Sequence, residues 1–297
     1  THFQWPDSAI PRSRRKLEMV HAWRIENTDL WKTYERATAE LKVVCRGLPP
    51  SWQAHLEVRG HDDATAHLPG ALDQRINETF LMVGVPKRCV MSVLTNGLDD
   101  QLPASASARL GTGVYASEIS AACDQHSEAD GDAYFTAGDA LHERLWPGGE
   151  HQFKHGFKEL ADDDELRYMF VCRVALGHVC KSKDGRRDSV DHTRSVWTTD
   201  QRLELAYVDG QQTFHYNTMV ALAGSQESGH QNDKFREFIL PRGERLIYPE
   251  YLIAYRRTGY SCREALLHAD ASAETGLGSC PPPPPRGVRR EFPTRQL

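Results

Sequence analysis

The chain has 297 residues and a formal net charge of -5, from 36 lysines and arginines against 41 aspartates and glutamates. That length can bury a full core, and 39% hydrophobic with 26% charged residues is typical of a globular protein. The slightly acidic balance, with a pI near 6.3, argues against a chain that works mainly by electrostatic binding of nucleic acid. No run of 18 apolar residues occurs, so no membrane span is expected.

Seven cysteines are present, an odd number with no Cys-x-x-Cys pair. Neither a disulfide framework nor a zinc ribbon is indicated, and we expect an intracellular protein, cytoplasmic or nuclear, in a reducing compartment. Cys172, His178 and Cys180 are close enough in the chain to be considered as metal ligands. They fall in an apolar run that alternating burial in a strand explains better, so we expect no bound metal.

The chain begins with an extended lead-in, residues 1–16, which is polar and basic and contains two prolines. Residues 16–25 alternate apolar and polar side chains, which predicts a strand. The Asn-Thr-Asp run at 27–29 then supplies an N-cap for a helix. Apolar residues follow at helical spacing: Leu30, Trp31, Tyr34, Ala37 and Leu41. We expect Trp31 and Tyr34 to anchor this helix in the core.

The middle of the chain alternates short strands and helices. Prolines and glycines mark residues 47–70 as a loop-rich insertion that precedes them. The patterns that follow predict a strand at 79–83, a helix at 86–96 ending at Gly97, a strand at 113–115 and a helix at 117–126.

The second half carries short apolar segments rich in β-branched and aromatic residues, which are typical of strands. They are residues 168–179, 204–208, 214–221, 235–240 and 251–256. Because the predicted helices gather in the first half, the order favours an α+β fold over a doubly wound one. We expect a mixed, mainly antiparallel sheet with a few flanking helices, in one domain at 17–258.

Residues 259–297 differ in composition from the domain. They are small and polar, then include five prolines at 281–285 and a basic segment. This composition predicts a disordered tail with the proline run in polyproline II conformation. Such a run can also bind a proline-recognising domain, but a plain linker is the favoured interpretation.

Three sequence blocks in the region 77–115 are distinctive in their order. Asn-Glu-Thr-Phe-Leu-Met-Val-Gly at 77–84 is followed by Ser-Val-Leu-Thr-Asn-Gly-Leu-Asp-Asp at 92–100 and by Gly-Thr-Gly-Val-Tyr at 111–115. A lone Gly-x-Gly is weak evidence for a nucleotide site. In this order, however, the blocks resemble the NAD-binding core of the poly(ADP-ribose) polymerase family. The resemblance implies the ADP-ribosyltransferase fold, an α+β fold with a split sheet.

The resemblance extends to both ends of the predicted domain. The strand and capped helix at 20–34 are similar to the family's first elements, and the hairpin at 235–253 is similar to its last. In that hairpin Glu237 falls on the family's catalytic glutamate, and Glu250 falls in a Tyr-Pro-Glu-Tyr segment where we expect a structural role. By itself, Glu237 would be interpreted as a surface glutamate in a strand.

The resemblance assigns roles to several residues around the cofactor. Gly84 would grip the nicotinamide carboxamide through its backbone, and Tyr115 would stack on the ring. Cys123 stands where the family usually has a serine that binds the carboxamide, and a small packing residue is an equal alternative. His126 stands where the family has a second stacking tyrosine, and a histidine ring can also stack.

One signature residue is missing. The family's first strand ends in His-Gly-Thr or His-Gly-Ser, where this chain has Val83, Gly84 and Val85. The histidine orients NAD by donating to a ribose hydroxyl, and valine has no donor. Loss of such a contact costs about 1 to 3 kcal/mol, a factor of roughly ten to over a hundred.

The resemblance implies an NAD-dependent protein ADP-ribosyltransferase, with NAD as co-substrate, protein acceptors and no metal. Glu237 would bind the 2'-hydroxyl of the nicotinamide ribose and stabilise the oxocarbenium-like centre. We favour transfer of single units over chain building. The alternatives are a weak or inactive homologue that binds NAD, ADP-ribose or a protein partner, and a scaffold that binds no nucleotide.

Overall fold

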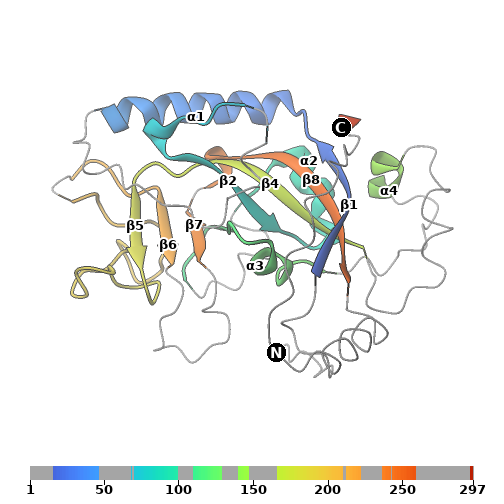
Figure 1. Ribbon diagram of the computed structural model, residues 1–297. Helices are drawn as coiled ribbons and strands as arrows, with labels where there is room; N and C mark the ends of the chain where they lie inside the picture. The colour runs from blue at the N-terminus through green and yellow to red at the C-terminus, as the bar shows by residue number, and fades with distance from the viewer. Residues whose placement is uncertain are drawn as a thin grey trace, which may run out of the picture.

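The computed structural model describes residues 16–46, 68, 70–99, 110–128, 140–146, 166–209, 212–221, 236–241, 243–258 and 295–296. These residues form an α+β fold with two sheets, mainly antiparallel, and few helices (Figure 1). The α+β class predicted from the sequence is therefore confirmed.

The larger sheet has five strands in the order β2-β4-β8-β1-β9. Its first four strands pair antiparallel, whereas β9 pairs with β1 in parallel. The strands are β1 (Lys16–Arg24), β2 (Glu78–Gly84), β4 (Arg167–Ala175), β8 (Ile247–Thr258) and β9 (Arg295–Gln296). The chain ends that bound the predicted domain thus lie side by side in β1 and β8.

The smaller sheet has four strands in the order β3-β7-β6-β5. They are β3 (Val114–Ala116), β5 (Val179–Ser182), β6 (Thr218–Ala221) and β7 (Glu237–Leu240). β3 and β6 flank β7 antiparallel, and β5 pairs with β6 in parallel. Met82 of β2 and Ser117, just after β3, exchange two backbone hydrogen bonds of 2.8 and 2.9 Å, so the two sheets meet there.

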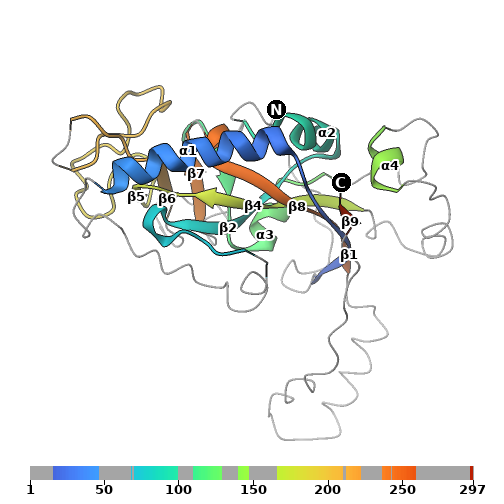
Figure 2. The same ribbon diagram turned by 90° about the horizontal axis from the view of Figure 1, so that it is seen from above.

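The longest helix, α1 (Thr28–Arg46), lies across the larger sheet (Figures 1 and 2). The carboxamide oxygen of Asn27 accepts hydrogen bonds from the backbone of Asp29 and Leu30, over 3.2 and 3.1 Å, which confirms the predicted N-cap. Tyr34 is buried, and Trp31 packs partly buried against the same cluster. Both aromatic residues therefore anchor the helix, as expected.

Three shorter helices complete the described elements. α2 (Lys87–Asn96) ends at Gly97, whose φ of 84° is a conformation that favours glycine, as the sequence predicted. α3 (Ser120–Asp124) lies beside β2, and α4 (Ala140–Leu145) was not expected from the sequence. Two 3-10 turns, Gln74–Ile76 and Gly243–Arg245, precede β2 and β8.

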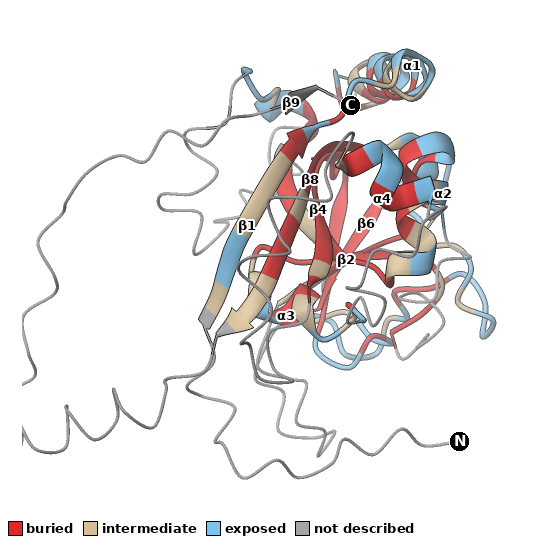
Figure 3. Ribbon diagram, turned by 90° about the vertical axis from the view of Figure 1, so that its right-hand side faces the viewer, coloured by how far each residue is buried: buried red, intermediate tan, exposed pale blue. Residues whose placement is uncertain are grey.

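The main core lies between the two sheets and the apolar faces of α2 and α4. Its members alternate along the strands, as in Tyr168, Phe170, Cys172 and Val174 of β4. Figure 3 shows the central strands largely buried, while β1 nearer the edge is partly exposed. A second cluster packs on the far face of the smaller sheet, around Tyr115.

Four predicted elements need correction. The strand at 168–179 is two strands in different sheets, because Gly177 turns the chain with a φ of 56° between β4 and β5. The helix at 117–126 shrinks to α3, since Ser117 is held extended by its bridge to Met82. Residues 204–208 make only isolated bridges rather than a strand, and the strand at 214–221 is reduced to β6.

Some predictions fall on residues that are not described. Residues 1–15 of the lead-in, most of the 47–70 insertion and most of the 259–297 tail lie outside the described residues. The exception in the tail is β9. Among the described helices, none combines the length and the apolar character needed to cross a membrane.

Candidate active site

The register of β3 and β7 brings two sequence-predicted residues to one face of the smaller sheet. Tyr115 in β3 lies opposite Ile239 in β7. Glu237 begins β7 two residues before Ile239, so its side chain points to the same face. Residues far apart in the sequence, Tyr115 and Glu237, are therefore diagonal neighbours in the sheet.

Tyr115 is a packed and hydrogen-bonded residue. Its hydroxyl donates to the carbonyl of Gly111 over 2.7 Å and accepts from the backbone of Leu110 over 3.2 Å. Only 6% of the residue is exposed. A ligand ring that stacks on Tyr115 would therefore have to take the place of atoms that now cover it.

The indole ring of Trp197 packs against Gly111, at the start of the Gly-Thr-Gly-Val-Tyr segment. A Cβ atom on Gly111 would lie 2.2 Å from the Trp197 indole, and the φ of 124° at Gly111 also favours glycine. The indole N–H donates to the carbonyl of Gly185 over 2.7 Å. Nothing in the sequence spacing singled out Trp197, because the contact depends on how the long segment between β5 and β6 folds back.

Glu237 faces a histidine across a short gap. Nε2 of His126 lies 3.9 Å from Oε1 of Glu237, and the two side chains are 26% and 14% exposed. His126 follows α3, and its backbone N–H donates to the carbonyl of Cys123 over 3.0 Å. The carboxylate and the imidazole therefore form a partly exposed pair at the edge of β7.

The residues next to Glu237 fix the start of β7. Nε of Arg236 donates to Oε1 of Glu118 over 3.0 Å, and the Glu118 side chain is only 3% exposed. The Ser117 hydroxyl donates to the carbonyl of Arg236 over 2.9 Å. These contacts tie β7 to the segment after β3. No sequence pattern singled out Glu118 and Arg236 beyond their position beside the motifs.

Gly84 and Cys123 are in close contact. A Cβ atom on Gly84 would lie 1.9 Å from the carbonyl oxygen of Cys123, so only glycine fits at this position. The Cys123 thiol is 3.0 Å from the carbonyl of Met82 and donates to it. Burial raises the pKa of this thiol to about 12, and the Glu237 carboxylate acts in the same direction. Cys123 therefore stays a protonated donor at neutral pH.

Among the candidate residues predicted from the sequence, Val83 is the one that the structure does not bring together with the others. It is 1% exposed and belongs to the main core cluster with Val114 and Phe238. Those two residues alternate with Tyr115 and Glu237 along their strands and point to the opposite face of the smaller sheet. The position of the missing family histidine is thus an apolar core position in this chain.

The other candidates gather where β2, α3 and β7 meet. Gly84 touches Cys123, the Cys123 thiol lies within the electrostatic influence of Glu237, and Glu237 faces His126. Such a group offers a carboxylate that can stabilise a cation and an imidazole that can accept a proton. In the described part of the chain, no group of three or more histidine, cysteine or acidic side chains could hold a metal ion.

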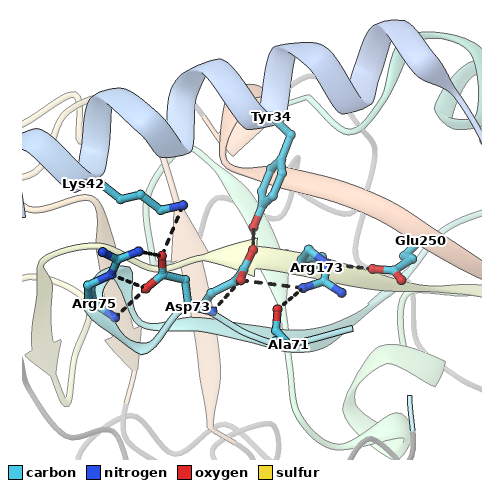
Figure 4. Close-up of polar contacts among 8 residues, drawn as sticks. Tyr34, Lys42, Ala71, Asp73, Arg75, Arg173 and Glu250 are labelled. Carbon is cyan, nitrogen blue, oxygen red and sulfur yellow. Dashed lines mark hydrogen bonds and ion pairs between the residues drawn. The ribbon is translucent and has the colours of Figure 1, made fainter. Parts of the chain in front are cut away.

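A second polar group lies beneath α1 (Figure 4). The buried Arg173 donates to Glu250 over 2.8 Å and lies 3.6 Å from Glu78. Glu78 accepts a 2.6 Å hydrogen bond from the Tyr34 hydroxyl. An open groove of about 610 Å³ is lined by Tyr34, Glu78 and Arg173, among other residues. Because Arg173 pairs with both glutamates and Tyr34 of α1 donates to Glu78, this group holds the helix to the sheet, in agreement with the structural role expected for Glu250.

Comparison with known proteins adds no assignment. No protein-family model matches the chain, and no curated protein matches it in sequence.

Proposed function

We propose that the chain is an NAD-dependent protein ADP-ribosyltransferase, an enzyme of the glycosyltransferase class. It would use NAD as co-substrate, transfer single ADP-ribose units to protein acceptors and release nicotinamide. The observation that carries the proposal is the junction of β2, α3 and β7, which gathers Gly84, Cys123, His126 and Glu237. Gly84 and Glu237 match sequence motifs that resemble those of one family of such enzymes, and Cys123 and His126 stand where that family has a serine and a tyrosine.

Glu237 has the central role in this mechanism. Its carboxylate accepts a hydrogen bond from the 2'-hydroxyl of the nicotinamide ribose and stabilises the positive charge that grows at C1' as the glycosidic bond breaks. The neighbouring Arg236–Glu118 contact holds the strand on which this carboxylate stands. A carboxylate fixed in this way needs little reorganisation during the reaction, which increases its effect.

The nicotinamide end would contact the backbone of Gly84 and the thiol of Cys123. The thiol has a single proton, which it now donates to Met82. The thiol can donate to the nicotinamide carboxamide only after its hydrogen bond to Met82 is broken. Tyr115 would form the wall of this pocket after a local adjustment of the atoms that cover it.

The arrangement of the sheets also supports the proposal. The bridge of Met82 and Ser117 brings β2 and β3, the two motif strands, side by side where the two sheets meet. We therefore propose the ADP-ribosyltransferase fold for this chain. The proposal also includes a single domain at 17–258 and an intracellular compartment.

The second candidate function is a weak or inactive homologue that binds NAD, ADP-ribose or a protein partner. Two observations favour it: the burial of Tyr115, and an apolar core residue, Val83, at the place of the family histidine. The burial of Tyr115 hinders stacking on the nicotinamide ring, and Val83 lacks the polar contact that orients NAD.

Incubation with NAD labelled in the adenylate part separates the two functions. The transferase predicts covalent label on protein together with free nicotinamide, and Glu237→Gln abolishes both. Binding of NAD measured by calorimetry, without label or nicotinamide, would identify the inactive homologue. Absence of both binding and transfer would overturn both functions and leave a scaffold.

A further inference from the structure

The gap between His126 and Glu237 places an imidazole nitrogen beside the carboxylate that would bind the ribose. At 3.9 Å, Nε2 of His126 and Oε1 of Glu237 are too far apart for a direct hydrogen bond. A hydroxyl oxygen about 2.8 Å from Nε2 can donate its single proton to that nitrogen, while Glu237 accepts from the ribose 2'-hydroxyl as proposed above. Since both side chains are partly exposed, a group from another molecule can reach this position.

Glu237 is the carboxylate that faces His126, because the acidic side chains of Asp124 and Glu128 are paired with other residues. On α3, Asp124 accepts hydrogen bonds from Arg257 over 2.9 and 3.0 Å and from the Tyr255 hydroxyl over 2.9 Å. After α3, Glu128 is paired with Arg88 of α2. On the side of β7, the neighbouring Arg236 is engaged by Glu118.

This geometry discriminates between acceptor groups. A carboxylate acceptor would carry its negative charge close to Glu237, and like charges at such a distance repel. It also has no proton to lose, so it needs no base. A serine or threonine hydroxyl is neutral but must lose its proton during attack, and neutral imidazole is a suitable acceptor for it.

We infer that His126 is the general base of the transfer and that the acceptors are hydroxyl-bearing side chains, serine or threonine. This inference rests on the proposed function. In the step, the hydroxyl oxygen forms a bond to C1' and its proton passes to Nε2 of His126. The glycosidic bond breaks, and its electron pair goes to the nicotinamide nitrogen, which leaves as neutral nicotinamide.

The role is different from the ring stacking that the resemblance implies for position 126. A stacking residue acts through its aromatic face, and tyrosine would replace it. A base acts through Nε2, and a tyrosine hydroxyl, with a pKa near 10, does not accept a proton at neutral pH. Glutamine keeps a polar side chain of similar reach but has no basic nitrogen.

The test uses the full chain and three peptides that differ only in one acceptor residue: serine, glutamate or arginine. Wild type, His126→Gln, His126→Tyr and the control His192→Gln, at an exposed histidine, are incubated with labelled NAD. We measure label on each peptide and total free nicotinamide, and thermal melting checks folding. If His126→Gln melts early, His126→Asn takes its place.

We expect wild type and His192→Gln to label the serine peptide, and both His126 variants to lose about a hundredfold of that transfer. Full transfer by His126→Tyr would identify a stacking residue and overturn the inference. Preference of wild type for the glutamate or arginine peptide would also overturn it, while the proposed function stands. Absence of both label and nicotinamide with wild type would mean that the proposed function itself has failed, and the inference with it.

Discussion

Nε of Arg173 in β4 donates to Oε2 of Glu250 in β8 over 2.8 Å, and both side chains are less than 8% exposed, at 7% and 6%. The bond crosses the centre of the larger sheet, where the guanidinium also lies 3.6 Å from Glu78 of β2. One arginine therefore joins three adjacent strands beneath α1, and Tyr34 extends the contact to the helix. This network positions β2, whose last residue, Gly84, belongs to the candidate site.

Removing one partner of the network should destabilise the fold strongly. Glu250→Ala leaves the charge of Arg173 buried with less compensation, which costs about 3 to 5 kcal/mol in the free energy of unfolding. The matched control is Glu18→Ala, which breaks the ion pair with Arg256 between half-exposed side chains, 52% and 27% exposed, and should cost about 1 kcal/mol or less. Urea denaturation measures both, and equal losses would contradict the network's role.

The contact of Gly84 with Cys123 predicts a position-specific effect of a single methyl group. In Gly84→Ala the new Cβ meets a backbone oxygen at 1.9 Å, so β2 and α3 must separate. We expect a loss of about 1 to 3 kcal/mol or more in stability, and weaker NAD binding by calorimetry. Gly243→Ala is the control, since its Cβ would meet side-chain atoms at 3.1 Å or more. Unchanged melting of Gly84→Ala would show that the junction is not packed as described.

Tyr115 allows the ring and the hydroxyl to be tested separately. Tyr115→Phe keeps the ring but loses the bonds to Gly111 and Leu110, and should cost about 1 to 2 kcal/mol in stability. If the ring contacts nicotinamide, NAD binding by the folded Tyr115→Phe variant should change little. Tyr115→Ala should lose both stability and binding. Equal NAD affinity of the phenylalanine and alanine variants, measured while both are folded, would exclude the ring from the site.

Asp73 should contribute to the acid sensitivity of the fold. The side-chain hydrogen bond from Arg75 holds the pKa of the Asp73 carboxyl well below its usual range, and Lys42 acts in the same direction. A pKa that is lower in the folded state gives stability that is present above the unfolded value of about 3.9 and is lost as the pH falls through the folded value. Asp73→Asn should therefore be less stable than wild type at pH 7, with a difference that shrinks below about pH 4.

Denaturant unfolding at pH 7 and at pH 3 measures this difference. Asp200→Asn, at an exposed aspartate, is the control and should show little change at either pH. A stability difference between wild type and Asp73→Asn that is the same at both pH values would contradict the assignment.

The sequence predicted the elements whose signals are local. Asn27 before an apolar helical stripe, and Gly97 after one, located α1 and α2 because capping depends on neighbouring residues alone. Residues 168–179 were predicted as one strand because the apolar run is continuous. The turn at Gly177 depends on the two sheets diverging, which a run of side chains does not encode.

The candidate site shows the same difference between local sequence signals and contacts of distant segments. The motifs identified Tyr115 and Glu237, and the strand register brings them to one face. The burial of Val83 and the closing of the Gly111 loop by Trp197 were not predictable, because both result from packing between distant segments. The 3.9 Å pair of His126 and Glu237 likewise needed the structure, since only the fold brings α3 beside β7.

The most direct test of the central claim is the rate of nicotinamide release and protein labelling from NAD by wild type, Glu237→Gln and the exposed control Glu244→Gln. Loss of a preorganised carboxylate at the reacting centre should lower both rates by about a hundredfold to a thousandfold in Glu237→Gln. Glu244→Gln should react as wild type does. Label and nicotinamide that persist at the wild-type rate in Glu237→Gln would contradict the role of Glu237 and with it the proposed mechanism.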